Sequence, residues 1–129
     1  MLRKLFYLAI IIVVCVAFYR QILVKAQEYV DQHAQEPWAP KMQLNIGKAY
    51  SFARDYDQAE KTFLLLKKKF PKSKYASKAQ WMIASIYETK EDYLRAKVEF
   101  EKFIKDYPTD EYAKKADDKL RIYSLFKEE

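Results

Sequence analysis

The longest apolar segment of the chain lies near its N-terminus. Every residue from 5 to 19 is apolar or aromatic, and residues 22–24 continue the pattern beyond Arg20 and Gln21. About twenty apolar residues suffice for one membrane-spanning helix, and an arginine near its end can extend its charged head to the interface. The pattern therefore predicts an uncleaved N-terminal transmembrane helix.

Two other interpretations of this segment remain open. Arg3 and Lys4 resemble the charged start of a signal peptide, and cleavage after Ala17 or Ala26 would release a soluble secreted form. Lipid attachment at Cys15 is the third interpretation. The bulky Val14 before that cysteine, and the apolar run after it, speak against lipid attachment.

The charges around the apolar run give its expected orientation. Arg3 and Lys4 precede it, whereas residues 20–36 contain two basic and three acidic side chains. The positive-inside rule then favours a cytoplasmic N-terminus, with the rest of the chain on the other side of the membrane. Apolar residues recur at helical spacing as far as Ala34, so residues 1–36 are interpreted as an anchor helix and stalk, with a solvated His33.

Residues 37–129 contain an internal repeat with a period of 37 residues. The matching positions include Ala39 with Ala76, Lys41 with Lys78, Gln43 with Gln80, Ile46 with Ile83, Tyr50 with Tyr87, Asp55 with Asp92, Ala59 with Ala96, Phe63 with Phe100, and Pro71 with Pro108. Apolar residues follow helical spacing twice within each unit. The pattern predicts an all-α solenoid: helical hairpins at about 38–74 and 75–111, and a capping helix at 112–126.

Two features of each unit predict how its second helix is built. Asp55 and Asp92 stand where a short carboxylate can accept hydrogen bonds from the free amides at the helix start. Phe63 and Phe100 fall on the apolar face and are expected to fill the space between the two helices.

These positions resemble the tetratricopeptide repeat (TPR) family. The family's Leu-Gly, Tyr, Ala, Phe and Pro spacing is matched by Ile46-Gly47, Tyr50, Ala59, Phe63 and Pro71, and by Ile83-Ala84, Tyr87, Ala96, Phe100 and Pro108. Gln43 and Gln80 depart from it, because they occupy the family's tryptophan position. The long period and the Phe-Pro or Tyr-Pro ends are similar to repeats of bacterial outer-membrane assembly lipoproteins and the Tol–Pal cell-division coordinator. The resemblance implies protein–protein interaction in the cell envelope.

The resemblance also implies that the first helices of the repeats line a concave face that binds a partner. The positions on that face are Lys41, Leu44, Lys48, Phe52, Lys78, Trp81 and Ser85, followed by Thr89, Ile122 and Phe126. Lysine mixed with apolar residues suits a peptide or helix segment of another protein, with Trp81 as the strongest contact. Alternatively, Trp81 and Leu44 pack against a neighbouring helix.

The charge distribution adds a second candidate surface. The formal net charge is +6, and lysines crowd the end of the first repeat at Lys67, Lys68, Lys69, Lys72 and Lys74. This cluster could attract an acidic partner or anionic lipid headgroups, or it could be a solvated turn. A neighbouring copy could also meet it with acidic residues near the C-terminus, such as Asp117 and Asp118, which would form a homo-oligomer.

The composition leaves little room for catalysis. The chain has one glycine, one cysteine and one histidine, so phosphate loops, internal disulfides and histidine-rich metal sites are not expected. We expect no enzyme, no cofactor and no nucleic-acid partner. The predicted function is a membrane-tethered interaction module of the bacterial inner membrane with a periplasmic repeat domain. The alternatives are a structural subunit of a larger envelope complex and a secreted TPR protein.

Overall fold

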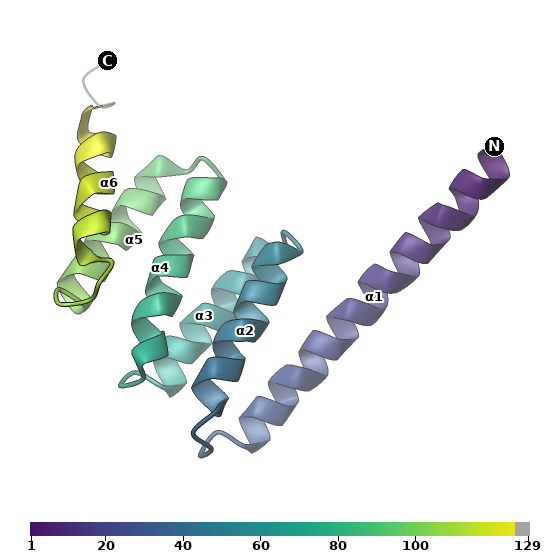
Figure 1. Cartoon of the computed structure of the whole chain (residues 1–129), viewed down its shortest axis with the longest axis horizontal. Coiled ribbons are helices and arrows are strands. Elements are labelled where there is room, and N and C mark those ends of the chain that lie inside the picture. The colour runs from purple at the N-terminus through teal and green to yellow at the C-terminus, as the bar shows by residue number, and fades with distance from the viewer. Residues whose placement is uncertain (126–129) are drawn as a thin grey trace.

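The computed structural model describes residues 1–125, which form helices and no strand (Figure 1). The helices are α1 (Leu2–Gln32), α2 (Ala39–Phe52), α3 (Tyr56–Lys69), α4 (Lys74–Thr89), α5 (Tyr93–Asp106) and α6 (Ala113–Leu125). The all-α prediction is confirmed. Phe126, which the sequence pattern placed at the end of the capping helix and on the inner face, lies outside the described residues.

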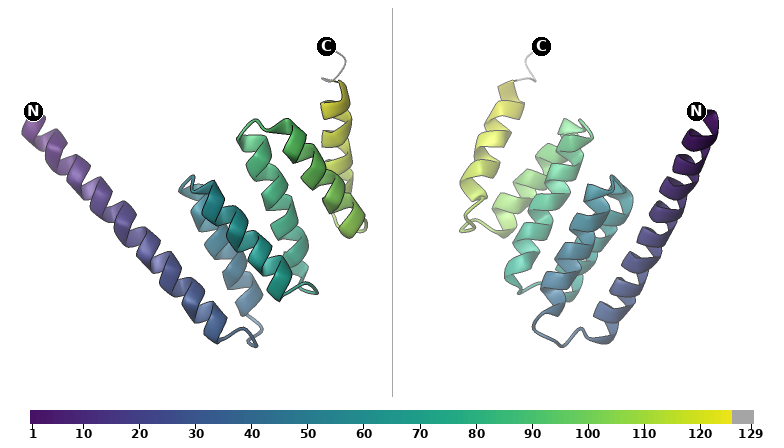
Figure 2. Two further views of the ribbon diagram at one scale, coloured as in Figure 1. Left: turned by 180° about the vertical axis from the view of Figure 1, so that it is seen from behind. Right: turned by 45° about the vertical axis from the view of Figure 1, so that its right-hand side comes forward.

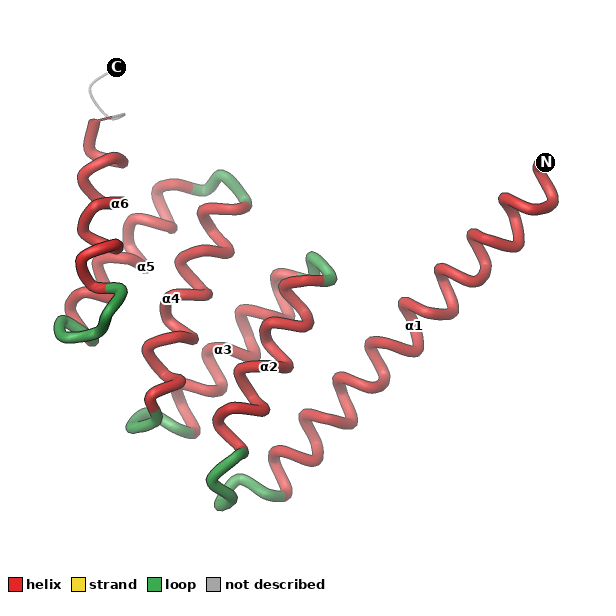
Figure 3. Tube along the Cα trace, viewed as in Figure 1, coloured by secondary structure: helices red, strands yellow, loops and turns green. Residues whose placement is uncertain are grey.

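The helices pack in chain order as antiparallel neighbours (Figure 3). The hairpins are α2 with α3 and α4 with α5, and α6 packs against α5. The backbones of α2 and α4 also approach each other closely, whereas those of α3 and α5 do not within the described part of the chain. The first helices therefore approach each other on the inner side of the solenoid, and the second helices diverge on the outer side.

The two hairpin corners have the same construction. The Asp55 carboxylate accepts a hydrogen bond from the Gln58 amide at 3.4 Å, and Asp92 accepts one from the Arg95 amide at 3.2 Å. Both predicted N-caps are therefore present. The residue before each cap is left-handed, with φ of 61° at Arg54 and 59° at Glu91.

The core lies between the paired helices. Its largest fully buried side chains include Phe63 and Leu66 in α3 and Phe100 and Phe103 in α5. Phe63 and Phe100 thus fill the hairpins as their spacing predicted. Burying a side chain of this size stabilises a fold by about 1.5–3 kcal/mol.

The second half of α1 belongs to this packing and is not a free stalk. Leu23 and Val30 are buried in the same core as the repeats, and Tyr19 and Ala26 pack against it. His33 is half-buried instead of solvated, because its ring lies 4.2 Å from that of Tyr29, centroid to centroid. Of the periodic apolar positions that predicted a stalk, Ala26 and Val30 therefore pack into the common core, whereas Ile22 is exposed.

The ends of the helices show that the second half of α1 occupies a position in the repeat. Helices α1, α3 and α5 end at Gln32, Lys69 and Asp106, which follow each other at intervals of 37 residues. Helix α1 packs on α2 as α3 packs on α4. Residues 19–32 therefore stand where the second helix of a preceding repeat would stand.

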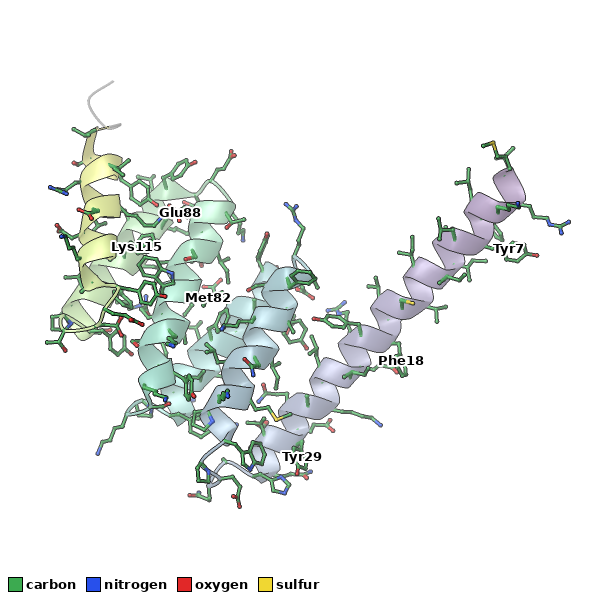
Figure 4. The ribbon with its side chains drawn as sticks, viewed as in Figure 1. Tyr7, Phe18, Tyr29, Met82, Glu88 and Lys115 are labelled. Carbon is green, nitrogen blue, oxygen red and sulfur yellow. The ribbon has the colours of Figure 1, made fainter. Side chains whose placement is uncertain are left out.

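The first half of α1 projects from the solenoid without packing against it (Figure 2). Tyr7 and Phe18 lie on this projecting part, whereas Tyr29 lies close to the α1–α2 loop (Figure 4). Within residues 1–125, α1 is the one helix long and apolar enough to cross a membrane.

Candidate partner-binding face

A hollow of about 200 Å³ lies on the inner side of the solenoid. It is formed by α2, α4, one side chain of α5 and the α5–α6 loop, and its lining residues are Lys48, Ser77, Lys78, Trp81, Met82, Phe103, Asp110 and Tyr112. Three residues that the sequence analysis assigned to the concave face, Lys48, Lys78 and Trp81, therefore meet at one site.

Trp81 forms the floor of this hollow and is half-buried. Its ring centroid lies 4.9 Å from that of Tyr112, 5.1 Å from Phe100 and 5.7 Å from Phe103. Aromatic rings at these distances attract each other beyond simple burial. Trp81 thus combines both interpretations of its position, since it packs on the core and lines the hollow.

The rim of the hollow carries positive charge. Lys48 and Lys78 are exposed on either side of it, on α2 and α4. The Lys115 ammonium lies 5.7 Å from the centre of the Trp81 ring and 5.9 Å from that of Tyr112. The Asp110 carboxylate accepts a hydrogen bond from the Tyr112 amide at 2.9 Å, so it is engaged in forming the loop. The site suits an apolar side chain beside a carboxylate.

Several predicted face residues lie elsewhere. Leu44 is only 2% exposed and belongs to the core, so it offers no contact to a partner. Phe52 projects from the corner between α2 and α3, at the end of the inner face. Ser85 is half-buried, and its carbonyl accepts a hydrogen bond from the Thr89 hydroxyl at 2.9 Å.

Lys41 lines a separate groove between α1 and α2. The groove has a volume of about 560 Å³, and its lining residues are Leu23, Ala26, Trp38, Lys41, Met42, Asn45 and Ile46. This groove was not predicted, because the sequence pattern indicated that α1 does not pack on the repeats.

The predicted lysine cluster is not a single surface. Lys67 is half-buried, its ammonium donates to the Gln80 side-chain carbonyl, and burial lowers its pKa. Lys69 forms an ion pair with Asp31 of α1 at 2.5 Å. Lys68, Lys72 and Lys74 are exposed.

Five lining residues of the hollow were not predicted as part of the partner-binding face: Ser77, Met82, Phe103, Asp110 and Tyr112. Tyr112 had a signal, because it follows Tyr75 at the repeat interval of 37 residues. No sequence pattern indicated that the α5–α6 loop would turn toward α4. Within residues 1–125, no group of three or more His, Cys, Asp and Glu side chains is arranged to hold a metal ion.

The fold and the hollow define a class of protein: a short helical-repeat protein built for interaction with other proteins and preceded by an apolar helix. The model of the YfiO family, described as an outer membrane lipoprotein, matches residues 45–117, and the chain belongs to this family. The match spans most of α2, the next three helices and the start of α6. It confirms the resemblance found in the repeats and indicates a cell-envelope location. No curated protein matches the chain.

Proposed function

We propose that this protein is a membrane-anchored binding module of the bacterial cell envelope. Its inner face holds a segment of another envelope protein in the hollow between α2, α4 and the α5–α6 loop. The observation that carries this proposal is the meeting of the half-buried Trp81 with the exposed Lys48 and Lys78 around one cavity. Holding the partner is the whole mechanism.

The expected ligand follows from the chemistry of the hollow. A volume of about 200 Å³ accommodates one large side chain rather than a whole helix. An apolar side chain of the partner would stack on Trp81, because tryptophan is enriched among the residues that contribute most to binding energy. An acidic residue beside it would pair with Lys48 and Lys78. The proposed ligand is therefore a segment that presents an aromatic or aliphatic residue beside Asp or Glu.

The proposed anchor is α1 itself, as a single-pass helix of the inner membrane with a cytoplasmic N-terminus. Its first half is exposed and carries the apolar run, which follows Arg3 and Lys4. Residues 37–129, together with the second half of α1, would then form the periplasmic unit.

The family description favours a second route of anchoring. The family is described as an outer membrane lipoprotein, and Cys15 is exposed on the projecting part of α1. Intact mass of the membrane-bound protein separates the two routes. The unmodified full-length mass supports the helix anchor, whereas a shorter lipidated chain beginning at Cys15 supports lipid attachment.

The binding proposal is tested by photo-crosslinking in cells. A benzoylphenylalanine at position 78 should crosslink to a defined partner segment, whereas the same probe at Lys105, an exposed lysine of the outer helix α5, should not. A peptide of the captured segment should bind the purified protein, and replacing its acidic residue should weaken binding. Equal crosslinking at both positions would contradict the proposed face.

A further inference from the structure

The solenoid has two edges where helices end and the chain turns. One edge contains the α2–α3 turn, the α4–α5 turn and the C-terminal end of α6, and the other contains the α1–α2, α3–α4 and α5–α6 loops (Figures 1 and 3). The first half of α1 projects on the side of the first edge (Figure 2). We call the first edge the anchor edge and the second the distal edge.

Two contacts fix α1 to the anchor edge at the end of its apolar run. The Tyr19 hydroxyl donates to the Ala49 carbonyl in the last turns of α2 at 2.7 Å. The Arg20 guanidinium lies 3.5 Å from the Asp55 carboxylate, at the cap of α3. The α2–α3 corner is therefore level with the point where the apolar run ends and the folded unit begins.

The anchor edge exposes large apolar side chains. Outside α1, the most exposed large hydrophobic residues are Phe52 at 92%, Leu94 at 74% and Leu125 at 73%. Phe52 ends α2, Leu94 follows the α4–α5 turn by one residue, and Leu125 ends α6. All three thus lie in helix ends at the same edge. At the distal edge, the helix ends and loops of residues 29–39, 67–76 and 104–115 expose one large hydrophobic side chain, Tyr29, at 48%.

The repeat shows that the fold does not require this exposure. The residue 37 positions after Phe52 is Thr89, which occupies the same corner of the second hairpin. A polar residue therefore satisfies the same backbone geometry. Packing within the fold therefore does not account for Phe52, and large apolar side chains that gather on one edge are typical of a surface that contacts protein or membrane.

We propose that the anchor edge lies against the bilayer that α1 enters, with Phe52, Leu94 and Leu125 in its interfacial layer. This inference rests on the proposed anchoring by α1. Apolar and aromatic side chains gain free energy when they leave water for the boundary between headgroups and acyl chains. The corner carries Arg20 and Arg54 beside Asp55 and Asp57, so apolar contact dominates and anionic lipid is not required.

This orientation decides where the other surfaces face. The exposed Lys72 and Lys74 lie in or beside the α3–α4 loop of the distal edge, so they point away from the membrane surface. Their charge is then available to an acidic protein and not to the lipids of the anchoring membrane.

The experiment uses the full chain in vesicles. Cys15→Ser removes the one native cysteine, and a single new cysteine at Phe52, Leu94 or Lys72 carries an environment-sensitive fluorophore. The protein is reconstituted into phosphatidylcholine vesicles, floated, and exposed to lipids with a nitroxide at the headgroup level. We expect most of the fluorescence to be lost at positions 52 and 94 and none at position 72. Phe52→Thr, the residue of the second hairpin, should reduce quenching of the label at 94.

The outcomes separate this inference from the anchor. Absence of the protein from floated vesicles would overturn the anchor and the edge contact together. Flotation with equal quenching at positions 52, 94 and 72, or with none, would overturn the edge contact and leave the anchor standing. Quenching at 52 and 94 that appears only after anionic lipid is added to the phosphatidylcholine vesicles would also contradict the apolar contact proposed here.

Discussion

The Tyr19 hydroxyl donates a hydrogen bond of 2.7 Å to the Ala49 carbonyl, which joins α1 to α2 at the level where the apolar run ends. The bond is one of several along this interface. Further along α1, Leu23 and Val30 are buried in the common core, and Gln27 exchanges hydrogen bonds of 2.8 Å with Gln43. The second half of α1 therefore acts as a helix of the solenoid.

This packing predicts a large difference between two truncated chains. A fragment of residues 19–129 should unfold cooperatively. A fragment of residues 35–129 should have a free energy of unfolding lower by about 3–6 kcal/mol, because Leu23 and Val30 no longer cover the core. Urea unfolding of both fragments followed by circular dichroism measures the difference. Equal free energies of unfolding would show that α1 adds nothing to the domain.

The sequence predicted the hairpins because their packing repeats within the chain. Asp55 and Asp92, and Phe63 and Phe100, recur at the same interval, and each pair plays the same part in the structure. Because two different local sequences must satisfy the same geometry, a residue that occurs in both units indicates what that geometry requires. Caps and fillers of the hairpins were therefore predictable.

The 37-residue interval also extends into α1, but it was not used to predict the packing of that helix. Tyr19, Tyr56 and Tyr93 are spaced by 37 residues, but Tyr19 closes an apolar run that suggested lipid. An apolar helix face shows that water is excluded, and it does not show whether lipid or protein excludes it. The groove beside Lys41 could not be predicted for a related reason, because it depends on which helix lies next to α2. For Leu44, the sequence left both a partner contact and packing against a helix open, and the structure shows the packing.

Gln43 and Gln80 predict a second effect, because both are fully buried at the tryptophan position of the family. Gln43 donates to the Thr62 carbonyl at 3.2 Å, and Gln80 donates to the Glu99 carbonyl at 3.0 Å. Replacing either by leucine should lower the free energy of unfolding by about 1–3 kcal/mol, since a buried partner is left unpaired.

A double variant checks the mechanism of this glutamine effect. Lys67 donates to the side-chain oxygen of Gln80, whereas the donor to the side-chain oxygen of Gln43 is Gln27 of α1. Lys67→Met should therefore recover part of the stability lost in Gln80→Leu and none of that lost in Gln43→Leu. Thermal unfolding is measured for Gln80→Leu and Gln43→Leu, each with and without Lys67→Met. Equal recovery of stability by Lys67→Met in both backgrounds would contradict this account.

The contact between α4 and α6 predicts a dependence on pH. Glu88 accepts hydrogen bonds from Lys119 at 2.5 Å and Tyr123 at 2.7 Å. Burial opposes ionisation of Glu88, but these bonds and the nearby lysines outweigh it and hold its pKa below the ordinary 4.5. The stabilisation is complete above that value and is lost as the pH falls through the lowered pKa.

The pH effect is measured by urea unfolding at pH 6 and pH 3.5 in the wild type and in Glu88→Gln. The wild type should lose more stability than the variant, by no more than about 1.4 kcal/mol, because one pKa unit corresponds to that free energy and pH 3.5 lies one unit below the ordinary pKa. The variant keeps a neutral side chain at both values. Glu91→Gln, an exposed substitution two residues from the end of α4, is the control and should behave like the wild type. Identical losses in all three proteins would show that Glu88 is not the titrating group.

Substitutions at the predicted inner-face positions should affect stability and binding separately. Leu44→Ala should destabilise the fold by about 2–5 kcal/mol, because the side chain is in the core. Lys48→Glu with Lys78→Glu should change stability by no more than about 0.5 kcal/mol, since both side chains are exposed. The double charge reversal should nevertheless weaken binding of an acidic partner segment by at least tenfold, measured by calorimetry, while Lys105→Glu should not.

Gly47 and Phe63 provide the last prediction, because the two helices of the first hairpin touch there. A Cβ added at Gly47 would lie 2.4 Å from Cε1 and 2.7 Å from Cδ1 of the Phe63 ring, which is fully buried. Gly47→Ala gains about 1 kcal/mol of helix propensity but forces the ring against its neighbours, which costs about 1–3 kcal/mol. We expect a net loss of stability in thermal unfolding.

The second hairpin supplies the control for this contact. Ala84 takes the place of Gly47 opposite Phe100, so this pair of helices has already adjusted to a Cβ. Ala84→Gly should lose about 1 kcal/mol of helix propensity and about 0.8 kcal/mol more for the buried methyl group. In the first hairpin, Phe63→Leu should lower stability by itself, yet lower it less when Gly47→Ala is also present, because the smaller side chain leaves room for the added methyl group. Additive losses would show that the effect of Gly47→Ala has a cause other than contact with Phe63.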